Sequence, residues 1–150
     1  MHVNPEIFKA YDVRGDFPEQ LNAKAAYLIA RAFAEFTRGN NPARALKFIV
    51  SSDARPSSPE LKKAVIEGLL DEGAQIIDLG LTTTPFHYYA IVKEDADGGI
   101  MVTASHNPFR MNGLKLSKKG AEPLGDGMSV VKSIAERGIF DGKKPHREVV

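Results

Sequence analysis

The chain has 150 residues, of which 43% are hydrophobic and 26% are charged, and its formal net charge is +1. This length fits one domain with a sizeable core, and the composition is that of an ordinary globular protein. The near-zero net charge gives no reason to expect a nucleic-acid partner, and the absence of cysteine excludes disulfides and thiolate metal sites.

No targeting or membrane segment is evident in the sequence. Residues 1–6 lack the basic and then apolar pattern of a signal peptide, and no apolar run approaches the length that crosses a bilayer. We therefore expect a cytoplasmic protein without a membrane partner. No two of the four histidines have the spacing of zinc ligands; they are His2, His87, His106 and His146.

Helix and strand patterns alternate along the chain. Apolar residues spaced by three and four predict a helix over residues 21–38, which the Gly-Asn-Asn-Pro run at 39–42 ends. Strands are predicted over residues 45–50, 74–79 and 98–102, where short apolar runs are bounded by turn-forming residues.

The start of the second helix has two interpretations. Ser57 and Glu60 have the spacing of a capping box, in which each side chain accepts a hydrogen bond from the other's backbone. Alternatively, Ser58 caps the helix and Pro59 occupies its first position. Gly73 is the expected end of this helix.

The second half of the chain continues the alternation. Thr84 is the expected cap of a helix over residues 86–93, a short strand is expected near 114–117, and a last helix over 128–137. Residues 142–145 are expected to form a linker. The pattern predicts a single α/β domain over the whole chain, with a mixed, mostly parallel sheet flanked by helices.

A polar loop follows the strand expected at residues 98–102. It carries the string T-A-S-H-N-P at residues 103–108. Ser105 is a hydroxyl nucleophile, His106 an imidazole and Asn107 an amide donor. Because α/β sheets bind ligands at the carboxyl ends of their strands, this loop is the candidate site for an anionic substrate.

A lysine follows this loop at a short distance. Asn112 and Gly113 form a turn signal, which predicts that the chain folds back there and brings Lys115 toward Ser105. A lysine suits phosphate as a point charge. The alternative interpretation is a polar turn whose hydroxyl and amide groups only satisfy the backbone. The full string and its place after a strand favour the functional interpretation.

Two further clusters contain arginines. Residues 8–15 alternate apolar and polar side chains, which suggests an edge strand that turns at Gly15. Arg14 in this segment has the donor fork that suits phosphate, but from these residues alone a solvated arginine beside Asp12 is the favoured interpretation. Asp53 and Arg55 follow another strand, and bracing of their loop and capping of the next helix is the favoured interpretation for both.

These strings together resemble the α-D-phosphohexomutase family. F-K-A-Y-D-V-R-G at residues 8–15, T-A-S-H-N-P at 103–108 and N-G-x-K at 112–115 carry the resemblance. The first string is closest to the bacterial phosphomannomutase/phosphoglucomutase branch. At residues 51–52, where the family often has Gly-Arg, this chain has two serines.

The resemblance implies an isomerase that interconverts hexose 1- and 6-phosphates through a bisphosphorylated sugar. Ser105 would be its phosphoserine and would bind Mg²⁺ through the phosphate. Lys115 and Arg14 would lie near the transferred phosphoryl group and serve catalysis. Substrate-binding roles are implied for three further residues, which are Tyr11, His106 and Asn107. Glucose 1,6-bisphosphate would be the activator, and mannose and glucose phosphates the substrates.

The family has four domains, and only the first is matched by residues 1–150. An aspartate-rich metal loop, a sugar-reading loop and the main phosphate loop belong to domains 2–4, which are the implied partners. We therefore expect a truncated first domain that is inactive alone. The alternative is a stand-alone module that binds phosphate or sugar phosphates. A serine hydrolase is disfavoured, because Ser105 lacks the G-x-S-x-G elbow.

Overall fold

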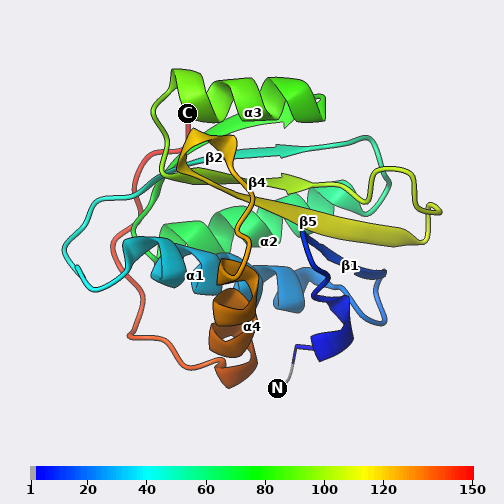
Figure 1. Cartoon of the computed structure of the whole chain (residues 1–150), viewed down its shortest axis with the longest axis horizontal. Helices are drawn as coiled ribbons and strands as arrows, with labels where there is room; N and C mark the ends of the chain where they lie inside the picture. The colour runs from blue at the N-terminus through cyan, green and yellow to red at the C-terminus, as the bar shows by residue number, and fades with distance from the viewer. Residues whose placement is uncertain (1–2) are drawn as a thin grey trace.

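A computed structural model describes residues 3–150, so His2 lies outside the described part. Five strands form one sheet in the order β1-β5-β4-β2-β3 (Figure 1). The strands are β1 (Val13–Asp16), β2 (Lys47–Ser52), β3 (Gln75–Leu81), β4 (Gly98–Val102) and β5 (Met111–Lys118). Because β2 is parallel to β3 and β4, whereas β5 is antiparallel to β4 and β1, β5 alone runs in the opposite direction.

Helices cover both faces of this sheet. The α-helices are α1 (Ala23–Arg38), α2 (Ser58–Asp71), α3 (Thr84–Lys93) and α4 (Gly127–Arg137), and two 3₁₀ turns cover Pro5–Ile7 and Lys119–Ala121. Figure 1 shows α3 on one face and α1, α2 and α4 on the other. The predicted α/β class, with a mixed and mostly parallel sheet between helices, is confirmed.

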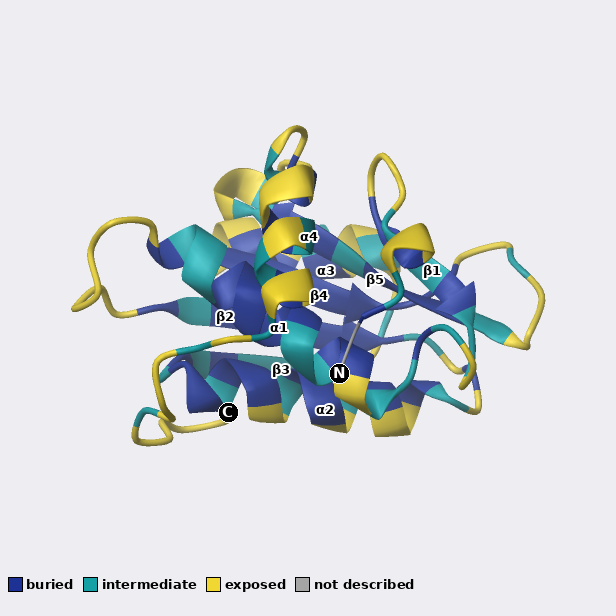
Figure 2. Cartoon of the chain, turned by 90° about the horizontal axis from the view of Figure 1, so that it is seen from below, coloured by how far each residue is buried: buried dark blue, intermediate teal, exposed yellow. Residues whose placement is uncertain are grey.

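The main core lies between the sheet and the α1–α2 layer. Val13, Val102 and Leu114 project from neighbouring strands onto this face and are fully buried. A smaller core under α3 contains Ile49 and Ile91. Among residues 3–150, the buried residues of this smaller core come from β2, α3 and Ala96, and none comes from β1 or β5. Figure 2 shows the buried strands at the centre, with exposed residues on the loops and on the outer sides of the helices.

Three local predictions need correction. Thr83, not Thr84, caps α3, since its hydroxyl accepts the Phe86 N–H at 3.4 Å. Gly15 lies inside β1 rather than at a turn. Asn112 and Gly113 lie inside β5, and the chain instead reverses in the segment 103–110.

The start of α2 follows neither of the two predicted caps completely. Ser57 occupies the cap position, but its hydroxyl makes no capping hydrogen bond. It accepts instead from the Asn112 side-chain amide at 2.8 Å, so that no capping box forms. Ser58 is the first helical residue, Pro59 follows it, and the Ser58 hydroxyl donates to Asp53 at 2.7 Å.

The chain after α4 is attached to the body of the fold. Asp71 at the end of α2 accepts hydrogen bonds from Tyr27 at 2.5 Å and from His146 at 2.7 Å. Val150 pairs with β3 through its N–H, which donates to the Ile76 carbonyl at 2.9 Å. The segment expected to be a linker, residues 142–145, is bound at its start as well, because the Arg31 guanidinium donates to the Gly142 carbonyl at 2.8 Å.

His87 on α3 makes the stability of the fold pH-dependent. It is fully buried, and its Nδ1 lies 2.6 Å from the Ser51 hydroxyl. Burial lowers the pKa of His87 from 6.5 to about 4. The unfolded chain therefore binds a proton between these pH values that the folded chain does not bind. The stability that neutral His87 contributes to the fold is complete above pH 6.5 and is lost as the pH falls toward 4.

We expect the free energy of unfolding to fall by about 2 kcal/mol between pH 7 and pH 5 because of His87. Urea denaturation at the two pH values measures this change. His87→Gln should flatten the dependence, whereas the exposed His106→Gln should keep it. The lowered pKa of Asp71 acts below 3.8, outside this window. An unchanged slope in His87→Gln would contradict the assignment.

Candidate active site

Ser105 lies in the turn that joins β4 to β5, at the carboxyl end of β4. Its side chain is exposed, and its backbone has a φ of 52°. This left-handed conformation is uncommon for residues other than glycine, and it persists only where the surroundings hold it. Its N–H donates to the Thr103 hydroxyl at 3.0 Å, and the Thr103 hydroxyl donates to Asp53 at 2.8 Å. The strained serine is therefore fixed to the neighbouring loop.

Arg55 binds the same turn on its buried side. Its guanidinium donates to the backbone carbonyls of four residues, which are Ser105, Asn107 and Pro108 at 2.8 Å each and Met111 at 3.1 Å. Asp53 pairs with its Nε at 3.1 Å. The favoured interpretation of Asp53 and Arg55 as a brace is confirmed, but the loop that Arg55 braces is that of Ser105. Nothing in the local sequence showed this contact.

Arg14 reaches the Ser105 turn from β1. Its Nε pairs with Asp12 at 2.8 Å, and its Nη1 donates to the Asn107 side-chain oxygen at 3.2 Å. Arg14 is therefore paired with Asp12, as the favoured interpretation has it, and it also contacts the Ser105 turn, whereas its role toward phosphate stays a prediction. The Arg14 side chain is 28% exposed, which leaves part of the guanidinium accessible to a ligand.

Lys115 shares a face of the sheet with Arg14. Arg14 pairs with Gly113, and Lys115 lies two residues further along β5, opposite Met101. Paired residues, and residues two apart, project on the same side of a sheet. This is the α3 side, since the Met101 sulfur contacts the Thr84 hydroxyl at 3.5 Å. Antiparallel pairing of β5, and not a turn at residues 112–113, places this half-buried lysine there.

Two hollows flank the Arg14–Asn107 contact. One of about 230 Å³ is lined in part by Tyr11, Asp12 and Lys115. The other, of about 410 Å³, is lined in part by Ser105, Asn107 and Arg55. Asp12 lines the smaller hollow, and its partner Arg14 contacts Asn107, which lines the larger one. His106 is exposed in the same turn as Ser105. The structure thus brings Arg14 into contact with the turn that holds Ser105, His106 and Asn107, whereas Tyr11 and Lys115 line the smaller hollow on the α3 face.

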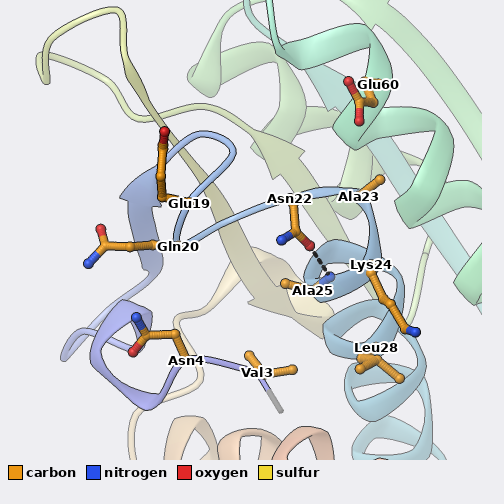
Figure 3. A pocket seen from close by; sticks show the side chains of 10 residues that line it. All are labelled: Val3, Asn4, Glu19, Gln20, Asn22, Ala23, Lys24, Ala25, Leu28 and Glu60. Atoms are coloured by element: carbon orange, nitrogen blue, oxygen red, sulfur yellow. Dashed lines mark hydrogen bonds between the residues drawn. The ribbon is translucent and has the colours of Figure 1, made fainter. Parts of the chain in front are cut away.

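A third hollow, of about 360 Å³, lies at the start of α1 and contains none of the predicted residues (Figure 3). Its lining includes Glu19, Glu60 and Lys24, so that its carboxylates outnumber its cations. The Asn22 oxygen accepts the Ala25 N–H at 3.0 Å and caps the helix, as the dashed line in Figure 3 shows. This hollow does not suit a phosphate.

The described residues form no cluster of three or more acidic or histidine side chains of the kind that holds a metal. Asp12 and Asp53 lie beside the Ser105 turn, and each forms a salt bridge with an arginine that contacts the turn. Among residues 3–150, no helix is both long and apolar enough to cross a membrane.

The family described as phosphoglucomutase/phosphomannomutase, alpha/beta/alpha domain I, matches residues 5–140 of the chain. The chain belongs to this family. It is 42% identical over 142 residues to a phosphomannomutase of Escherichia coli, and the match covers 93% of this chain and 30% of that protein. A phosphomannomutase of Klebsiella pneumoniae is also 42% identical, and the match covers 87% of it.

A solved structure agrees with this assignment. A phosphoglucomutase/phosphomannomutase family protein from Burkholderia thailandensis superposes with a TM-score of 0.85 at 32% identity, over 98% of this chain and 33% of that one. The chain therefore spans about a third of the length of the Escherichia coli and Burkholderia proteins. Its five-stranded mixed sheet and four helices are those of domain I of the family.

Proposed function

We propose that this chain is the phosphoserine-bearing first domain of a phosphomannomutase/phosphoglucomutase, with Ser105 as the group that carries the phosphoryl. The observation that supports it best is the Ser105 turn itself. Its hydroxyl is exposed, its backbone is held by Thr103 and Arg55, and the Arg14 guanidinium contacts the same turn through Asn107.

The charges around the turn suit phosphoryl transfer. A phosphoserine carries about −1.5 to −2 charges at neutral pH, and transfer depends on positioning and on neutralising that charge. Arg14 offers its partly exposed guanidinium from one side, and Lys115 offers an ammonium from the hollow beside it. Ser105 then donates its phosphoryl to a hexose monophosphate and takes the other phosphoryl back from the bisphosphorylated sugar.

The remaining site residues contact the substrate in this proposal. Tyr11 is 76% exposed and lines the hollow that contains Lys115, where it covers one side of a sugar phosphate. Asn107 is oriented by its hydrogen bond from Arg14. His106 lies exposed beside Ser105 and contacts phosphate or sugar hydroxyls.

The family uses Mg²⁺, and a bound Mg²⁺ would neutralise charge on the phosphoryl oxygens. Within residues 3–150, phosphorylated Ser105 is the ligand that fits this role, because Asp12 and Asp53 are engaged by arginines. One phosphate does not complete the coordination of Mg²⁺, so the other ligands belong to a further domain.

The complete reaction is proposed for a longer enzyme. The chain matches only 30% of its Escherichia coli relative, so a closed substrate site requires the domains that follow. The substrates are mannose and glucose phosphates, glucose 1,6-bisphosphate is the activator, and the enzyme acts in the cytoplasm. The 150-residue chain alone is proposed to be inactive as a mutase.

A domain exchange tests this proposal. The chain replaces the corresponding first domain of the Escherichia coli phosphomannomutase, and conversion of mannose 1-phosphate is measured with Mg²⁺ and glucose 1,6-bisphosphate. We expect turnover by the fusion and none by the 150-residue chain. The unmodified Escherichia coli enzyme is the control. A folded fusion without turnover, together with phosphate binding by the isolated chain, would favour a stand-alone binding module instead.

A further inference from the structure

We infer that Arg55 is a positioning residue for phosphoryl transfer at Ser105, and this inference rests on the proposed function. Arg55 lines the larger hollow but is only 7% exposed, and its N–H groups are already bonded within the protein, so it does not itself bind a substrate. Its five N–H groups are directed at Asp53 and at the four carbonyls of the segment from Ser105 to Met111. A planar guanidinium can serve several acceptors at once in fixed directions, which a lysine cannot do.

The contacts of Arg55 determine which way the peptide groups of the turn point. In a trans peptide the C=O and the N–H point in opposite directions. Because the Ser105 carbonyl points down to the buried Arg55, the following N–H, that of His106, points away from it and toward the exposed side of the turn. The Pro108 carbonyl likewise directs the Phe109 N–H outward.

This orientation matters for an anion at Ser105. Carbonyl oxygens on the outer side of the turn would repel a phosphate, whereas N–H groups attract it. Arg55 withdraws four carbonyls from that side and balances its own charge against Asp53. It also holds Ser105 in the left-handed conformation that the isolated turn would leave. Arg55 therefore prepares the turn for a phosphoryl group that it does not touch.

Amide hydrogen exchange of the 150-residue chain tests this role. The Ser105 and Asn107 N–H groups are bonded within the turn and report its order, whereas the Ile49 N–H in the inner strand β2, which pairs with β3 and β4, reports the sheet. In Arg55→Lys and Arg55→Met we expect the two turn amides to exchange about tenfold faster or more, relative to Ile49. If Arg55 acted only through its positive charge, Arg55→Lys would keep the wild-type exchange rate of the turn amides.

Arg38→Met is the matched control, because Arg38 is also a buried arginine but holds Glu72 at the other end of the sheet. It should lower overall stability without changing the ratio of turn to sheet exchange. In the active fusion described above, Arg55→Lys should lower kcat by about tenfold or more with little change in KM.

The two proposals fail in different ways. Turn amides in Arg55→Lys that exchange at the wild-type rate relative to Ile49 would overturn the role of Arg55, whatever the activity of the fusion. A wild-type fusion that folds but has no turnover would count against the proposed function and would leave the exchange result standing.

Discussion

Ser105→Ala is expected to abolish mutase turnover in the fusion with the Escherichia coli domains, with a loss on the order of 10³-fold or more. The hydroxyl is the group that accepts and returns the phosphoryl, and no other hydroxyl of the described turn is exposed, since Thr103 is buried and bonded to Asp53. Stability should change little, because the Ser105 side chain is exposed.

The measurement is the initial rate with mannose 1-phosphate, together with the intact mass of the protein after incubation with glucose 1,6-bisphosphate. Wild type should gain the mass of one phosphoryl group and the variant should not. Ser133→Ala, an exposed serine on α4, is the matched control and should behave as wild type. Phosphorylation of the Ser105→Ala variant to the same extent would remove Ser105 from its proposed role.

Gly113→Ala is expected to destabilise the fold by about 3 kcal/mol or more. A Cβ at this position of β5 would clash with the Val13 carbonyl and lie 2.7 Å from the Thr103 carbonyl. Both are backbone atoms of neighbouring segments, so the strands themselves would have to separate. Since Thr103 holds the Ser105 N–H, the same change should also disorder the turn.

Urea denaturation followed by circular dichroism measures this effect. Gly142→Ala is the matched control, because a Cβ there meets no atom within 4 Å. That variant should be as stable as the wild type. If Gly113→Ala were also as stable, then β1, β5 and the segment after β4 could not be packed as closely as the structure has them.

Local sequence patterns predicted an element correctly where the apolar face of one helix, or one short run of residues, is enough to identify it. The helix expected over residues 128–137 is α4 within one residue, and the strand over 98–102 is β4. The Ser105 loop was found because its polar string directly follows that strand. Each of these inferences needs only neighbours along the chain, which the sequence contains.

The errors arose where distant segments decide the outcome. Asn112 and Gly113 have the sequence of a turn, but the Asn112 amide is bound by Ser57 and Ser58, and Gly113 is enclosed by the backbones of β1 and Thr103. These tertiary contacts stabilise Asn112 and Gly113 in a strand, although both residue types have a low intrinsic preference for strands. Similarly, the cap of α3 moved by one residue to Thr83, a boundary that local propensity does not resolve.

The sequence alone thus determined the order of helices and strands, the Ser105 turn and the family to which its strings point. Only the tertiary structure decided that Arg14 contacts the Ser105 turn, that Lys115 lies on the same face of the sheet as Arg14, and that Arg55 binds the carbonyls of the turn. The physical reason is that β1 and β5 meet by hydrogen bonds between residues about a hundred positions apart, and that the carbonyls bound by Arg55 carry no side-chain signature.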